Sequence, residues 1–259
     1  MKKIIALLLC LVMAAASVMA LADDGSDKDY VVGRGKLIVG VTDFEPMDYR
    51  DENDEWIGFD ADLAREFAAY LGVDVEFVEI DWDNKILELD SKNIDCVWNG
   101  MTLRDDVLSA MSCTKPYMLN AQAVILRDDI VANYTTEESL SALTFAVENG
   151  SAGQDEAEAR DFEYNGVLSQ ADALMEVEAG VSGGAIIDLL MAKAMTGAGT
   201  SYADLAIALL LNEEEYGVGF RTGSDLAEEL NAFLDAKIAD GSLVELAKKY
   251  GLENALITE

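Results

Sequence analysis

Residues 36–80 read KLIVGVTDFEPMDYRDENDEWIGFDADLAREFAAYLGVDVEFVEI, and this stretch predicts the fold class. KLIVGV, at 36–41, is a continuous apolar run of the length of a buried strand. After Gly58, apolar residues recur at helical spacing as far as Gly72, a residue suited to ending a helix. VDVEFVEI, at 73–80, alternates polar and apolar residues as a strand does. A helix over about 84–91 and the strand IDCVWN at 94–99 follow, so the order β-α-β-α-β predicts a parallel sheet covered by helices.

A second α/β series follows a strand predicted at 122–127. LTFAV, at 143–147, is a strand, and the turn at 148–153 leads into a helix. A helix over 171–178, the short strand GAIID at 184–188 and a helix from 189 come next. The tail is helical over 225–239 and 242–250, with Gly241 between the two pieces. Two such series joined by extended segments predict two lobes.

The first 22 residues have the features of a signal peptide. Lys2 and Lys3 precede an apolar stretch at 4–16, and Ala20-Leu21-Ala22 forms a small-x-small cleavage site. We expect cleavage after Ala22 and export to the periplasm or the extracellular face. An uncleaved N-terminal anchor is the alternative, because residues 4–22 are nearly long enough to span a bilayer. Residues 23–33 are polar and are expected to form a flexible lead-in.

The composition of the 259 residues excludes several classes of function. With 18 Lys and Arg against 50 Asp and Glu, the surface repels nucleic acid and anionic lipid. The chain has no histidine, which removes Ser-His and Cys-His catalysis and most transition-metal sites. We therefore expect no metal and no cofactor. Cys96 and Cys113 either form a disulfide, which export permits, or remain buried free thiols.

Ligands of parallel sheets bind outside the carboxyl ends of the strands, and candidate side chains follow each predicted strand. They are Phe44 and Glu45 after the first strand, Trp82 after the second, Asn99, Gly100, Met101, Thr102 and Arg104 after the third, Gly150, Ser151 and Ala152 at a helix start, and Asp188. The free amides of a helix N-terminus bind a carboxylate, and a carboxylate at a strand end binds an ammonium group. With two aromatic side chains, the set describes an α-amino acid site. Each feature also has a plain structural explanation, as a rim aromatic or a helix cap.

The chain resembles the extracellular solute-binding proteins of family 3, the polar amino acid type. The resemblance is carried by GFDADLA, AVENGSAGQD, AGVSGGAIID and the terminal DGSLVELAKKYG, and it extends over nearly all of the chain after residue 22. It implies an α/β, two-lobed periplasmic-binding-protein fold of type II, with two hinge strands. Lobe 1 would comprise 34–121 plus 217–259, and lobe 2 would comprise 122–216. It also implies a monomer that delivers an amino acid to the membrane permease of an ABC importer and has no enzymatic activity.

The resemblance assigns roles to the candidate residues. Phe44 matches the aromatic residue that stacks on the ligand, and Trp82 matches the second apolar clamp. Asn99, Gly100 and Thr102 match the loop that holds the ligand, and Glu45 and Met101 adjoin these positions. Gly150, Ser151 and Ala152 match the helix N-terminus that receives the ligand's α-carboxylate. Asp188 matches the carboxylate that pairs with the ligand's α-ammonium.

One position departs from the family pattern. Where the family has an arginine that clamps the α-carboxylate, this chain has Val107. Arg104 lies three residues earlier, either as a displaced substitute or as a surface residue that offsets Asp105 and Asp106. Two other functions remain alternatives: a cyclohexadienyl dehydratase-like enzyme, with Asp43, Glu45 or Glu148 as its general acid, and a soluble ligand sensor.

Overall fold

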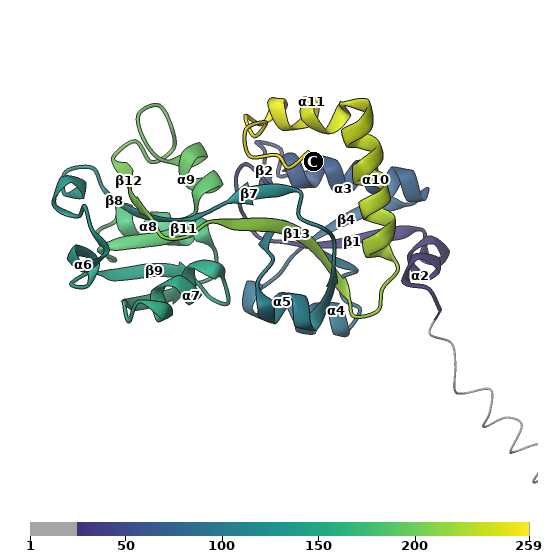
Figure 1. Cartoon of the computed structure of the whole chain (residues 1–259), viewed down its shortest axis with the longest axis horizontal. Coiled ribbons are helices and arrows are strands. Elements are labelled where there is room, and N and C mark those ends of the chain that lie inside the picture. Colours follow the sequence, from purple (N-terminus) through teal and green to yellow (C-terminus); the bar gives the residue numbers. More distant parts are fainter. Residues whose placement is uncertain (1–24, 259) are drawn as a thin grey trace, which may run out of the picture.

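Two separate sheets organise residues 25–258, the part of the chain that the computed structural model describes (Figure 1). We call the lobe built on the sheet of β1 the first lobe, and the lobe built on the sheet of β8 the second lobe. The predicted signal peptide and its cleavage site lie outside the described residues. Among residues 25–258, no helix has the length and apolar character needed to span a bilayer.

The first lobe confirms the predicted β-α-β-α-β order. Its strands lie in the order β4-β1-β5-β13-β6, and β7 also pairs with β13. β1 is parallel to β4 and β5, whereas β13 is antiparallel to β5, β6 and β7. The strands are β1 (Lys36–Val41), β4 (Asp74–Glu79), β5 (Cys96–Thr102), β6 (Met111–Cys113), β7 (Met118–Asn120) and β13 (Glu214–Arg221), with a small hairpin of β2 (Tyr49–Arg50) and β3 (Trp56–Ile57). The helices are α2 (Asp27–Arg34), α3 (Phe59–Leu71), α4 (Lys85–Asp90), α5 (Asp105–Ala110), α10 (Leu226–Asp240) and α11 (Ser242–Lys249), with the 3-10 turn η1 (Trp82–Asn84).

The second lobe is formed by one continuous stretch of chain. Its strands lie in the order β10-β9-β11-β8-β12, with β8 antiparallel to both of its neighbours. The strands are β8 (Gln122–Arg127), β9 (Thr144–Glu148), β10 (Glu163–Val167), β11 (Gly184–Asp188) and β12 (Leu205–Leu210). The helices are α6 (Glu137–Leu140), α7 (Ala152–Ala159), α8 (Gln170–Glu178) and α9 (Leu189–Met195), with the 3-10 turn η2 (Val131–Asn133). The sequence did not predict β10 or β12.

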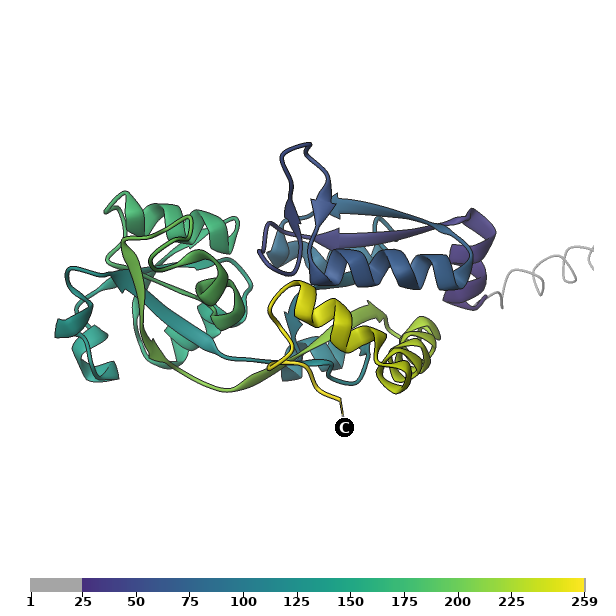
Figure 2. The ribbon, with the colours of Figure 1, turned by 90° about the horizontal axis from the view of Figure 1, so that it is seen from above.

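The chain passes between the lobes twice, and both connections run along one edge of the molecule (Figure 2). Only Ala121 separates β7 from β8, and residues 211–213 separate β12 from β13. β13 begins at Glu214, which is already paired with Asn120 of β7. The sequence assigned residues 214–216 to the second lobe, but this pairing ties them to the sheet of the first.

β5 is longer than the predicted strand and ends at Thr102. Its last residues pair with β13, Met101 opposite Gly217 and Thr102 opposite Tyr216. Gly100 adopts φ +54° within the strand, a conformation that favours glycine. The sequence placed these residues in a loop because their strand partner lies more than a hundred residues downstream.

The prediction that residues 23–33 form a flexible lead-in is wrong in part, because residues 27–34 form the helix α2. The Ser26 hydroxyl accepts a hydrogen bond from the Asp29 amide at 3.0 Å and caps the helix. Val31 is fully buried, and the Asp27 carboxylate pairs with Arg221 at 3.0 Å. The helix is fixed by tertiary contacts that the polar local sequence does not reveal.

Cys96 and Cys113 are free thiols, which excludes the disulfide alternative for this structure. β13 lies between the strands that carry them: Phe220 is opposite Cys96, and Gly219 is opposite Cys113. Two strand spacings of about 4.8 Å separate β5 from β6. This exceeds the limit of about 7 Å between the Cα atoms of a disulfide.

Candidate functional site

The two lobes meet in a cleft at the carboxyl ends of β5, β9 and β11. In this closed arrangement the cavity measures about 20 Å³, room for a water molecule but not for an amino acid. Ligand access therefore requires the lobes to separate. The cavity is lined by Trp82, Lys85, Asn99, Gly100, Met101, Thr102, Arg104 and Val107 of the first lobe, and by Glu148, Ser151, Ala152, Gln170 and Asp188 of the second.

Three of the predicted site residues do not line the cavity. Phe44 lies one layer below its wall, packed edge-on against Tyr216 with ring centroids 6.3 Å apart. A Cβ on Gly100 would lie 2.6 Å from the Phe44 ring, so the packing of Phe44 against β5 requires glycine at this position. Glu45 is half-buried away from the cavity. Gly150 contributes its carbonyl oxygen at the edge, where it accepts hydrogen bonds from the first lobe.

The Asn99 side chain makes its hydrogen bonds within the first lobe. Its side-chain oxygen accepts hydrogen bonds from the amide and hydroxyl of Thr42, at 3.0 and 2.8 Å. Its amide group donates to the Thr42 carbonyl at 3.0 Å and to Asp48 at 2.8 Å. These bonds tie the end of β1 to β5 and fix the backbone of the strand that forms the cleft wall.

Asp188 ends β11 as a buried carboxylate surrounded by donors. It accepts hydrogen bonds from the Tyr216 hydroxyl at 2.6 Å, from Gln122 at 3.0 Å, and from Asn120 and Gln170. Burial, followed by the neighbouring charge of Glu214, raises the pKa of Asp188 well above its ordinary value. A cation placed here would favour the ionised form, so the electrostatics of this site suit an ammonium group.

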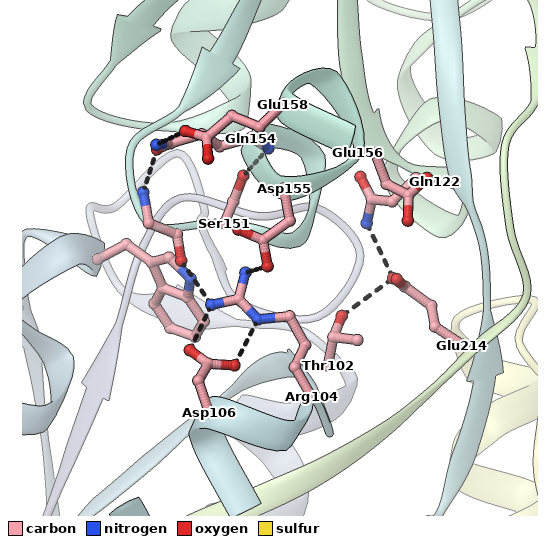
Figure 3. Close-up of polar contacts among 12 residues, drawn as sticks. Thr102, Arg104, Asp106, Gln122, Ser151, Gln154, Asp155, Glu156, Glu158 and Glu214 are labelled. Atoms are coloured by element: carbon pink, nitrogen blue, oxygen red, sulfur yellow. Dashed lines mark hydrogen bonds and ion pairs between the residues drawn. The ribbon is translucent and has the colours of Figure 1, made fainter. Parts of the chain in front are cut away.

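Glu214 adds a second carboxylate beside Asp188, at the start of β13. It accepts hydrogen bonds from Thr102 at 3.0 Å and Gln122 at 2.8 Å (Figure 3), and from Asn120 at 2.6 Å. Asn120 and Gln122 thus donate to both carboxylates, and the cluster spans the two connections between the lobes. The sequence did not single out Glu214, because its place beside Asp188 depends on the pairing of β7 with β13.

Two further ionisable side chains are buried in the cleft. Lys85 is 4% exposed, and its Nζ donates to the carbonyl oxygens of Trp82 at 3.1 Å and Gly150 at 2.9 Å. Burial and the charge of Arg104 lower the pKa of Lys85 to about 8. Glu148 is 2% exposed, and burial raises its pKa to about 8. Its Oε1 has no hydrogen-bond partner among the described residues.

Arg104 reaches across the cleft from the first lobe to the second. Its guanidinium forms two hydrogen bonds with Asp106, at 3.1 and 2.9 Å, and an ion pair with Asp155 of α7 at 2.9 Å (Figure 3). It also donates to the Gly150 carbonyl at 3.4 Å. Arg104 therefore offsets Asp106, as one alternative held, but it is mostly buried and bridges the lobes. Val107 is buried and lines the same cavity.

The sequence missed two residues of the cavity wall and named a third only for another role. Lys85 begins a short amphipathic helix and carries no local sign of burial. Gln170 follows β10, whose sequence EYNGV does not identify it as a strand. The sequence indicates Glu148 only as a possible general acid, although its place at the carboxyl end of a predicted strand also marks it as a residue of the cleft wall.

Comparison with known proteins identifies the family. Residues 37–253 match the model of the bacterial extracellular solute-binding proteins, family 3. The chain belongs to this family. A curated relative, the arginine-binding extracellular protein ArtP of Bacillus subtilis (strain 168), is 26% identical over 249 residues, which cover 94% of this chain and 96% of ArtP.

Solved structures of the family share the fold. A mutant of ArgBP from T. maritima, a protein also solved in an arginine-bound form, superimposes with a TM-score of 0.80 at 31% identity. The match covers 86% of this chain and 98% of ArgBP. The ancestral amino acid-binding protein AncCDT-1, a precursor of cyclohexadienyl dehydratase, has a TM-score of 0.78 at 28% identity, with 87% and 99% coverage. These solved proteins have the type II two-lobed fold that the sequence predicts.

Proposed function

We propose that this family 3 protein captures a small α-amino acid, or a related amine-carboxylate, and delivers it to the membrane permease of an ABC importer. Binding would close the hinge, because a ligand that touches both lobes favours an arrangement in which they meet around it, more open than the present one, whose cavity has no room for an amino acid. The proposal includes export by the signal at 1–22, cleavage after Ala22, and action as a monomer in the periplasm or at the extracellular face. The lobes would rotate about Ala121 and residues 211–213.

The buried carboxylate cluster of Asp188 and Glu214 is the observation that carries this proposal. Two adjacent carboxylates lie at the hinge side of the cleft, and both are already supplied with neutral donors. What the cluster lacks is a positive charge, and an α-ammonium group provides one. In the same proposal, Trp82 and Met101 contribute apolar wall, and Thr102, Ser151 and Ala152 contribute polar contacts.

Within the α-amino acids, we favour one with a basic side chain. A groove of about 640 Å³ adjoins the cavity and shares Thr102, Arg104 and Ala152 with it. The other charged residues that line this groove are all acidic: Asp155, Glu156, Glu213, Glu214 and Glu215. Such a groove attracts a cationic ligand. ArtP is named for arginine, which supports the same class.

A thermal-shift screen of the refolded, ligand-free protein against the twenty protein amino acids, followed by calorimetry, tests the proposal. We expect a basic amino acid to give the largest shift. Asp188→Asn should then weaken binding of that amino acid by at least about 100-fold, because the ammonium loses its buried charge partner. The fold should persist, because burial already favours the neutral form of Asp188. The exposed Asp204→Asn serves as the control.

The screen and the variant test different parts of the proposal. If no amino acid shifts the melting temperature of the wild-type protein, capture of amino acids is refuted. If Asp188→Asn binds as tightly as the wild type, the placement of the ammonium group is wrong although the function stands.

An enzyme of the cyclohexadienyl dehydratase type is the second candidate. The buried carboxyl of Glu148, with its pKa raised to about 8, has the protonation state that a general acid needs at neutral pH. AncCDT-1, the precursor of a cyclohexadienyl dehydratase, shares this fold. We expect no turnover of prephenate or arogenate, and measurable product with either, lost in Glu148→Gln, would favour the enzyme.

A further inference from the structure

We propose that Lys85 supplies the cation that binds the ligand's carboxylate, the role that the family pattern gives to an arginine where this chain has Val107. This inference rests on the proposed function, because it concerns how an amino-acid ligand is held. It assigns a ligand contact to the first residue of α4, a position that the sequence did not mark.

Lys85 is a buried cation without a counter-ion. Its Nζ touches only the carbonyl oxygens of Trp82 and Gly150, and lies 4.9 Å from the centre of the Trp82 ring. Among residues 25–258 Lys85 forms no ion pair within 4.0 Å, although the charges of Asp106, Glu148 and Asp83 act on it from farther away. An ammonium group has three N–H donors, and these contacts account for two. Burial disfavours an unpaired charge, so the arrangement favours a bound anion.

The other basic group in the cleft is already neutralised. Arg104 forms ion pairs with Asp106 and with Asp155, both at 2.9 Å. A ligand carboxylate would have to compete with these carboxylates for the Arg104 guanidinium. At Lys85 it would displace no ion pair, because the acidic groups that act on Lys85 lie beyond ion-pair distance, so Lys85 is the stronger candidate.

The surroundings of Lys85 also suit a carboxylate. Its bond to the Gly150 carbonyl brings it to the start of α7, whose Ser151 and Ala152 line the same cavity. The Ser151 hydroxyl is occupied by the Gln154 amide at 3.1 Å, whereas the first amides of a helix have no intrahelical acceptor. A carboxylate between Lys85 and α7 would join the two lobes, as closure requires.

Glu148 offers a competing explanation for Lys85. It is a second buried ionisable group in the cavity, one of its oxygens has no hydrogen-bond partner among the described residues, and the charge of Lys85 lowers its pKa against the larger effect of burial. If the two interact across the closed cleft, Lys85 would stabilise the closed apoprotein and would not recognise a ligand. The experiment must therefore measure recognition of the carboxylate itself.

Binding of matched acid and amide ligands makes this distinction. Calorimetry at pH 7 with L-arginine and L-argininamide, and with L-histidine and L-histidinamide, compares ligands that differ in the carboxylate. We expect the wild type to prefer the acid by about 100-fold. In Lys85→Met the preference should fall to less than about threefold, through weaker binding of the acid. Lys85→Arg should keep most of it, and the exposed Lys193→Met should not change it.

Each outcome has one meaning. The assignment to Lys85 is overturned if Lys85→Met still prefers the acid over the amide. It is also overturned if Arg104→Met, and not Lys85→Met, loses this preference. Equal binding of acid and amide by the wild type also overturns it while leaving capture of an amine intact. Absence of binding of any amino acid to the wild type refutes the proposed function, and the assignment with it. If Lys85→Met does not fold, Lys85→Gln takes its place, and a preference for the acid that persists in Lys85→Gln overturns the assignment.

Discussion

Replacing Glu148 by glutamine tests how the cleft holds a buried carboxyl group. Burial raises the pKa of Glu148 from 4.5 to about 8, and Lys85 opposes the rise only in part. Between these two values the unfolded chain has lost the proton and the folded protein has kept it. The free energy of unfolding is therefore insensitive to this group below pH 4.5, falls as the pH rises toward 8, and then levels off.

The magnitude follows from the difference between the two pKa values. One pKa unit corresponds to about 1.36 kcal/mol, so a rise from 4.5 to about 8 gives a loss on the order of 5 kcal/mol. Water that enters the cleft screens the charge, and we therefore take about 2 kcal/mol as the smallest loss expected. Glutamine cannot ionise, so the variant lacks this dependence.

Urea unfolding at pH 5, 6, 7 and 8 measures the effect. The wild type should lose stability relative to Glu148→Gln at each step, and the variant should be the more stable protein at pH 8. Other carboxyl groups affect both proteins alike and cancel in the comparison. Glu52→Gln, in the exposed β2–β3 connection, should follow the wild type. Parallel pH profiles for the wild type and Glu148→Gln would refute the reasoning.

Two more predictions concern the hinge and the cleft wall. Arg104→Ala removes the interlobe contacts with Asp155 and Gly150, so the ligand-free protein should open and show a larger radius of gyration in X-ray scattering. Arg127→Ala, whose partner Asp129 lies in the same lobe, is the control, and equal radii would contradict the bridging role. Gly100→Ala should lower the free energy of unfolding by about 1–3 kcal/mol, because φ is +54° and the new Cβ would lie 2.6 Å from the Phe44 ring. Gly180 also has a positive φ, +70°, but a Cβ there would have nothing within 4 Å. Gly180→Ala should therefore lower the free energy of unfolding by less, through backbone strain alone. Equal losses in the two variants would exclude a steric contribution at Gly100.

The sequence predicts those parts of the fold that local periodicity controls. β1, α3 and β4 follow one another with clear apolar patterns and a glycine at the helix end, and the structure has them at the predicted places. β10 escapes prediction because it is polar, and α2 because its burial depends on Arg221, far along the chain. The Cys96–Cys113 question could not be decided locally, since the strand between these residues comes from the C-terminal region.

The residues of the site likewise fall into those that the local sequence reveals and those that it does not. Thr102, Ser151 and Asp188 could be found because each follows a recognisable strand, and they meet at one cavity. Lys85 could not, because whether a lysine at the start of a helix faces solvent or the opposite lobe depends on how the lobes close. The roles of these residues toward a ligand stay predictions.

The position of β13 has a consequence for the order in which the chain assembles during synthesis. β13 lies between β5 and β6, but it follows the whole second lobe in the chain. The strands of the second lobe are contiguous, so that lobe can form as soon as residue 210 is available. Until β13 arrives, β5 and β6 have unpaired edges, and such edges invite chaperones or aggregation. The lobe that is begun first is therefore the one that is finished last.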